Sequence, residues 1–176
     1  MALIVETGAG ASTSEAFASV ADADLYFANR NITAWTLLTT ADKEAALRRA
    51  TDHMQQAYRE RWHGTRVTST QALDWPRWNV PMRDAPGGYG PVPAYYSSTA
   101  VPAEVRNACI TMALKAAAGD LAPDIERETI SESVGPISVS YAAGSRQTVR
   151  YQAVDKMLSV FLRDGGSGSM VTLLRA

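Results

Sequence analysis

Histidine and cysteine are the side chains from which a metal or nucleophilic site would first be built. His53 and His63 lie ten residues apart, and no Cys-x-x-Cys or His-Glu-x-x-His pattern supplies further ligands. Cys109, the only cysteine, falls on an apolar stripe and has no Gly-x-Ser-x-Gly-like context. We therefore predict no metal site, and we expect Cys109 to be a small core residue.

The acidic pairs and the glycine-rich stretch of the sequence likewise indicate neither a catalytic site nor a nucleotide-binding site. Asp22 and Asp24, like Asp42 and Glu44, lie near expected helix starts, where negative charge is favoured electrostatically. Gly8-Ala9-Gly10 lacks the third glycine and the flanking strand and helix of a dinucleotide-binding loop, so a flexible arm is the better interpretation. Without a convergent set of titratable groups, the sequence predicts a protein that is not an enzyme and has no cofactor.

Arginines in and after the second expected helix are the main candidates for binding. Tyr58 and Trp62 lie among them, a composition compatible with phosphate contact and base stacking, although Asp52 and Glu60 dilute the charge. The same arginines could pair with carboxylates at a subunit interface, and the spacing leaves both interpretations open. The candidates are Arg48, Arg49, Arg59, Arg61 and Arg66.

A second candidate is the loop segment Trp75-Pro76-Arg77-Trp78, in which two indoles and a guanidinium surround a proline. Such amphipathic side chains are common anchors at protein interfaces. Trp75 could equally pin the long loop to the protein's own core. Both interpretations stay open.

Helices must position these residues, and apolar side chains at three- and four-residue steps predict four of them. The first begins at Ser19 and runs to about Asn29, and the second covers 41–62 and ends at Gly64. The third starts at Pro102 and stops before Gly119, and the last contains 154–162. The apolar positions are Val20, Leu25, Tyr26 and Phe27, then Leu47, Ala50, Met54, Ala57, Tyr58 and Trp62, then Val105, Ala108, Cys109, Met112, Ala113 and Ala116, and finally Val154, Met157, Leu158, Phe161 and Leu162.

The segments between the helices are of four kinds. Residues 1–18 predict an extended arm after a short strand at 3–5, and the proline- and glycine-rich stretch 65–101 predicts a long loop. Alternation in 128–151 predicts a β-hairpin with a possible third strand near Val149. Residues 165–176 are a Gly/Ser linker and an apolar, strand-like tail. The hairpin alternation rests on Ile130, Val134, Ile137, Val139 and Tyr141.

The fold expected is mainly α, a small bundle of about four helices with an inserted β-hairpin and an extended C-terminal tail. Residues 1–164 form one domain in this interpretation. The 176-residue chain carries a net charge of −1, which provides no global field for nucleic acid or anionic lipid. A single cysteine, no secretory signal and no apolar run long enough for a membrane favour a reducing compartment such as a cytoplasm.

Six segments together resemble a family of tailed-phage proteins, the head–tail connector, also called the neck adaptor or head-completion protein. The same sequences are sometimes labelled DnaT-like single-stranded-DNA-binding proteins. The stretch QALDWPR is the most distinctive, and MRDAPGGYGPVPAYYSSTA at 82–100 departs from the family as an insertion. The other segments are SVADADLYFANR, WTLLTTADKEAALRRATDHM, VPAEVRNACITMALKA, VGPISVSY and Val-Asp-x-Met-Leu.

The resemblance implies a structural subunit of the virion neck, assembled in the host bacterial cytoplasm. Such subunits form rings, commonly of twelve copies, between the portal protein of the DNA-filled head and the tail or a second neck protein, and packaged double-stranded DNA passes through the lumen. The hairpin and tail could then pair with neighbouring subunits. The alternative function is single-stranded-DNA binding by the arginines. The expected subunit and portal contacts are Val134, Pro136, Ile137, Val139, Met170, Val171, Leu173, Leu174 and Arg175.

Overall fold

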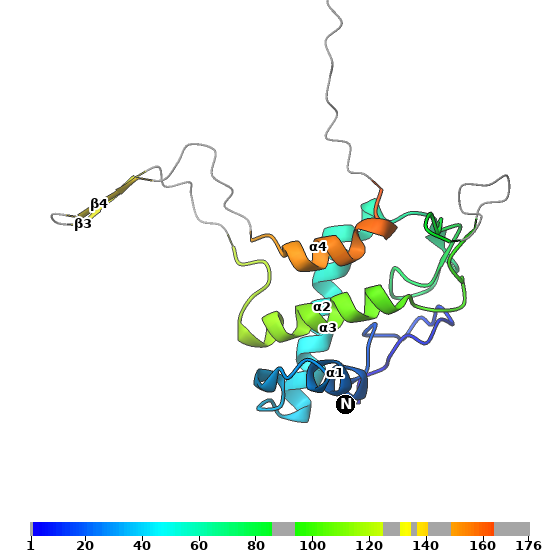
Figure 1. Cartoon of the computed structure of the whole chain (residues 1–176), viewed down its shortest axis with the longest axis horizontal. Helices are drawn as coiled ribbons and strands as arrows, with labels where there is room; N and C mark the ends of the chain where they lie inside the picture. Colours follow the sequence, from blue (N-terminus) through cyan, green and yellow to red (C-terminus); the bar gives the residue numbers. More distant parts are fainter. Residues whose placement is uncertain (1, 86–93, 125–130, 135–136, 141–148, 164–176) are drawn as a thin grey trace, which may run out of the picture.

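The computed structural model describes residues 2–85, 94–124, 131–134, 137–140 and 149–163. Four α-helices carry this part of the chain, and α2 runs between α1 near its start and α4 near its end (Figure 1). The prediction of a mainly α fold with a small hairpin is confirmed. The helices are α1 (Val20–Ala28), α2 (Thr40–Tyr58), α3 (Ala103–Ala118) and α4 (Gln152–Leu158), with short 3₁₀ turns η1 (Thr33–Trp35), η2 (Arg59–Arg61) and η3 (Ser159–Phe161).

Helix α1 begins where a local capping signal predicts it. The Ser19 hydroxyl accepts from the amide of Asp22, and the Asp22 carboxylate accepts from the amide of Ser19, which satisfies two orphan donors. Two expectations are wrong. Leu25 is 63% exposed, because it lies on a different face of the helix from the buried residues Ala23 and Phe27. Asp24 is not a cap, since it accepts hydrogen bonds from Trp35 and Lys43.

Helix α2 begins at Thr39, whose hydroxyl accepts from the amide of Asp42. Its predicted apolar stripe is buried except at Ala57. This residue is exposed because it points about 100° around the helix from its buried neighbour Tyr58. The helix stops at Tyr58, earlier than predicted, and tightens into η2. Gly64 is therefore not the cap of α2. At φ 68° it lets the backbone pass Trp78, whose carbonyl would clash with any Cβ.

The core lies where α2 packs on α3 and α3 packs on α4. The predicted stripe of α3 is entirely buried, with Cys109 fully inside it, as expected. In and after α4, the predicted face is also buried, apart from the half-buried Met157. Many of the facing residues in α3 are alanines, which lets the helices approach closely. Among the described residues, no helix is long and apolar enough to cross a membrane.

The N-terminal segment is not the extended, flexible arm that its composition predicts. The buried Glu6 carboxylate accepts hydrogen bonds from the amides of Gly8, Gly10 and Ala11 and from the Ser14 hydroxyl, at 2.8–3.0 Å. The strand expected at 3–5 is reduced to one bridge from Val5 to Ala16. One carboxylate thus folds the small residues into a compact turn against the body, because it satisfies their backbone donors.

The loop after α2 contains no long element in its described part, as predicted. Two-residue strands β1 (Thr65–Arg66) and β2 (Arg77–Trp78) pair antiparallel, and the Trp75–Pro76 peptide bond is cis. Further along, Pro81 bridges to Tyr95. The loop is therefore held at several points along the core.

The predicted hairpin is present as β3 (Ser131–Val134) and β4 (Ile137–Ser140), which pair antiparallel with Val134 opposite Ile137. Val149 and Arg150 are not in a strand and lead directly into α4, and the rest of the third strand expected near Val149 would lie at 141–148, outside the described residues. Ile130, Pro136, Tyr141 and the tail at 165–176 lie outside the described residues.

Candidate functional site

Arg48 holds the N-terminal segment on α2. Its guanidinium donates to Glu15 at 3.0–3.1 Å and lies 3.6 Å from Glu44, one helical turn earlier. The hydrogen bond from Arg48 lowers the pKa of Glu15, with help from the amide of Ile4. This predicted arginine therefore already has two carboxylate partners within its own chain.

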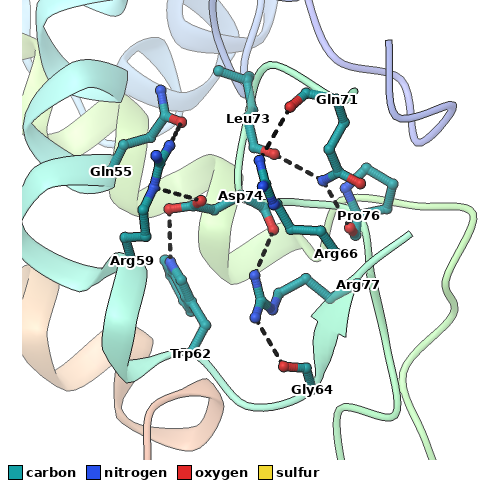
Figure 2. A network of polar contacts seen from close by, with 10 residues as sticks. All are labelled: Gln55, Arg59, Trp62, Gly64, Arg66, Gln71, Leu73, Asp74, Pro76 and Arg77. Carbon is teal, nitrogen blue, oxygen red and sulfur yellow. Dashed lines mark hydrogen bonds and ion pairs between the residues drawn. The ribbon is translucent and has the colours of Figure 1, made fainter. Parts of the chain in front are cut away.

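Arg59 and Arg66 take part in a polar network around the buried Asp74 (Figure 2). Arg59 donates to Asp74 at 3.1 Å and to Gln55 at 2.7 Å, while the indole of Trp62 donates to the other Asp74 oxygen at 3.3 Å. Arg66 donates to the carbonyl of Gln71. The network fastens the loop to the end of α2, so the first role of these arginines is structural.

The segment Trp75-Pro76-Arg77-Trp78 divides between core and surface. Trp75 is fully buried, with its ring edge-on to Phe161 at a centroid distance of 5.4 Å. Arg77 is 7% exposed and donates to three carbonyls, of His63, Gly64 and Asp74. Burial lowers the pKa of Arg77. The positive charges of nearby Arg163 and Arg66 lower this pKa further, whereas the negative charge of Asp74 raises it. Trp78 alone is open to solvent, at 49%.

A set of cations gathers at the end of α2 and along α4. The segments 61–63 and 161–163 run antiparallel, with a bridge between Trp62 and Leu162 and a 2.8 Å bond from the amide of His63 to Phe161. This pairing places Arg61 beside Arg163. We call the four cations of this region the basic surface. They are Arg61, Arg150, Lys156 and Arg163.

Among the residues that the structure describes, Asp155 is the one carboxylate that lines the basic surface. It accepts from the Arg150 guanidinium at 2.8 Å and from the Tyr58 hydroxyl at 2.7 Å. Burial alone would raise the pKa of Asp155, but these two hydrogen bonds outweigh it and lower the pKa. Burial and the bond to Asp155 raise the pKa of Tyr58. Asp155 is therefore ionised at neutral pH and neutralises Arg150.

The remaining three cations are available to an anionic ligand. In the part of the chain that the structure describes, no carboxylate pairs with Arg61, Lys156 or Arg163, and all three are exposed. With Asp155 they border a cavity of about 470 Å³ at the surface. The described lining residues include four positive groups and one negative group, whose charges sum to +3, which suits a phosphate-bearing partner.

Sequence reasoning found Arg61 but missed the other members of the basic surface. Arg150, Lys156 and Arg163 are spread over fourteen residues, and the first of them lies about ninety positions after Arg61, so no local pattern joins them. Arg49 is exposed on α2 and borders a neighbouring cavity. Of the predicted subunit contacts, Val134, Ile137 and Val139 are in the hairpin strands, and the rest lie outside the described residues.

Other chemistry is not assembled in the described ranges. Burial raises the pKa of Cys109 to about 11, and its sulfur contacts the Thr51 hydroxyl at 3.4 Å inside the core. Within residues 2–85, 94–124, 131–134, 137–140 and 149–163, no three His, Cys, Asp or Glu side chains cluster as metal ligands. The basic surface is therefore the strongest candidate site.

A family model described as "Putative DnaT-like ssDNA binding protein" matches residues 1–176, the whole chain. No curated protein matches the chain. No solved structure matches it either.

Proposed function

This chain belongs to the DnaT-like ssDNA-binding protein family, and we propose that it binds single-stranded DNA with the basic surface as its phosphate contact. The observation that carries the proposal is the convergence of Arg61, Lys156 and Arg163, which have no carboxylate partner among the described residues. Cations that neutralise phosphates release condensed counterions, which drives binding. The sequence expectation of a neck connector has no support from the family match, which favours the alternative expectation of DNA binding.

Arginines that the sequence singled out contribute unequally in this proposal. Arg61 is part of the basic surface, whereas Arg48 and Arg59 already pair with Glu15 and Asp74. Trp78, half-exposed in β2, offers an indole face on which a base can stack. We therefore assign the phosphates to α4 and the end of α2, rather than to the whole length of α2.

The test is fluorescence anisotropy with a labelled DNA strand of about 20 nucleotides, titrated between about 50 and 200 mM salt. Three to four phosphate contacts predict that log K falls with log salt with a slope of about −2 to −3. The triple variant Arg61→Ala, Lys156→Ala, Arg163→Ala loses binding at every salt concentration. Arg30→Ala is the matched control, because Arg30 follows α1 at the opposite end of α2 (Figure 1). Absence of wild-type binding at low salt rejects the proposal.

A second function, a ring-forming neck adaptor, is favoured by the β3–β4 hairpin. Within the described strands, β3 and β4 pair only with each other, so each has an outer edge that can pair with a strand of a neighbouring subunit. In this proposal the ring contains about twelve copies, as the resemblance implies, and docks between portal and tail proteins in the virion.

One variant separates the two functions. Replacing Ser131–Ser140 by a Gly/Ser linker removes both strand edges while leaving the basic surface unchanged. If the protein is an adaptor, mass photometry shows loss of the oligomer and portal-containing particles no longer incorporate the variant. If DNA binding is its only function, the anisotropy curve is unchanged and no wild-type oligomer forms. Incorporation of the variant at wild-type levels counts against the adaptor.

A further inference from the structure

A second cavity, of about 450 Å³, lies between α2 and the segment that follows α3. Four polar residues of α2 line one side of it at positions i, i+3, i+4 and i+7, so they share one helix face. The other side comes from the end of α3 and the residues after it. The lining residues are Arg49, Asp52, His53 and Gln56, with Ala116, Gly119, Asp120, Leu121 and Ala122 opposite them.

Most hydrogen-bonding groups of this cavity have no partner within the described chain. Arg49, Asp52 and Gln56 make no side-chain hydrogen bond or ion pair to any residue that the structure describes. Asp120 uses one oxygen to accept from the amide of Ala122 at 3.0 Å, which leaves its other oxygen available. Burial raises the pKa of Asp52, as expected for a carboxylate partly withdrawn from water. Donors and acceptors therefore face the cavity ready for a ligand.

The walls of the cavity are partly apolar. The buried residues Ala116 and Leu121 line it, and the His53 ring lies edge-on to Tyr151 at 5.5 Å between centroids. Burial lowers the pKa of His53, against an opposing effect of Asp120, so the imidazole is neutral at pH 7. A neutral ring and small alkyl groups suit the face of a planar, uncharged ligand better than an ion.

Charge distinguishes this cavity from the basic surface. Counted over the described lining residues, two carboxylates against one guanidinium sum to −1 in this cavity, which disfavours phosphate, whereas the basic surface sums to +3. The two are joined by a third hollow of about 370 Å³, which shares His53 with this cavity and Arg61 and Arg150 with the basic surface. A strand whose phosphates lie on the basic surface can therefore turn a base toward the carboxylates.

We propose that the cavity lined by Arg49, Asp52, Gln56 and Asp120 is a base pocket that takes one base of the bound strand and prefers cytosine over thymine. The N4 amino group of cytosine donates to a carboxylate, and its O2 and N3 accept from Arg49 or Gln56. Thymine has a carbonyl where cytosine has the amino group, which brings an acceptor against a carboxylate. This inference rests on the proposed DNA binding.

The experiment compares labelled oligo-dC and oligo-dT of about 20 nucleotides in anisotropy titrations at one salt concentration and pH 7.5. A good pair of base contacts predicts about tenfold tighter binding of oligo-dC. The double variant Asp52→Ala, Asp120→Ala reduces this ratio to about one, because oligo-dC loses the hydrogen bonds from its N4 amino groups and oligo-dT no longer places a carbonyl against a carboxylate. Asp124→Ala, an exposed carboxylate that does not line the cavity, keeps the tenfold ratio.

Each outcome bears on one proposal. Equal affinity of the wild type for the two strands overturns the base pocket but leaves DNA binding standing, as does a preference that survives the double variant. Binding of neither strand by the wild type rejects DNA binding itself. Circular dichroism of all variants confirms that exposed substitutions have left the helices intact.

Discussion

The backbone amide of Arg163 donates a 2.6 Å hydrogen bond to the carbonyl of Arg61. These residues lie about a hundred positions apart in the sequence. The bond nevertheless holds their backbones side by side, and both guanidinium-bearing side chains are exposed. Like charges side by side repel each other at a cost to folding, so such a pair is more easily explained by an anionic partner than by stability.

Opposite charge changes on the basic surface should have opposite effects on DNA affinity. Arg163→Ala removes one phosphate contact and is expected to weaken binding and to make the salt slope less steep by about 0.7. Asp155→Asn removes the negative charge that pairs with Arg150 and frees this arginine, so affinity should rise. Anisotropy titrations over a salt series measure both. A rise in affinity for Arg163→Ala would contradict the assignment of this surface.

The buried Asp74 should be important for stability. Asp74→Ala leaves the buried indole of Trp62 without its acceptor and the guanidinium of Arg59 with Gln55 alone, at a cost of about 2–4 kcal/mol in the free energy of unfolding. Urea denaturation followed by tryptophan fluorescence measures the change. The control Asp124→Ala, at an exposed position, should stay within about 0.5 kcal/mol of the wild type.

Substitutions of two glycines by alanine should differ sharply in their effect on the stability of the fold. Gly8 has φ 109°, and an added Cβ would lie 2.1 Å from the carbonyl oxygen of Thr99, so Gly8→Ala is expected to cost more than about 2 kcal/mol. At Gly119 the backbone is extended and an added Cβ would meet no atom within 4 Å. Gly119→Ala should therefore be neutral or slightly stabilising, and thermal melts of both variants measure the difference. Equal melting temperatures would show that the turn around Glu6 is not rigidly packed on Thr99.

Acid should destabilise the protein partly through Asp155. Because the pKa of Asp155 is lowered in the folded state, its contribution is fully present above the unfolded value of about 3.9 and is lost as pH falls toward the folded value. Urea midpoints at pH 7 and pH 3 should differ less for Asp155→Asn than for the wild type. An identical pH dependence of the two proteins would mean that the bonds from Arg150 and Tyr58 do not stabilise the ionised form.

Cys109 should resist thiol reagents in the native protein. It is fully buried, and with a pKa of about 11 only about 0.1% of it is thiolate at pH 8. Reaction with an aromatic disulfide reagent is expected to be slow in buffer and rapid in denaturant. Fast labelling of the folded protein would show that the contact between α2 and α3 opens readily.

Local signals in the sequence were sufficient to predict that four helices form and where the first two begin. Ser19 with Asp22 and Thr39 with Asp42 mark the starts of α1 and α2, because capping bonds join residues only three positions apart. The stripe of α3 is equally readable, since a period of 3.6 residues depends on the helix alone. Composition gave the wrong prediction, a flexible arm, for the N-terminal segment. The conformation there depends on the hydrogen bonds of Glu6 and not on the average flexibility of glycine and serine.

Only the tertiary structure decided which surface can meet DNA. The density of arginines in α2 was visible in the sequence, but their availability was not, because the partners of Arg48 and Arg59 come from distant segments. The basic surface likewise exists only once the chain at 161–163 pairs with the end of α2. Charge acts through space, so residues far apart in sequence combine their fields when the fold sets them side by side.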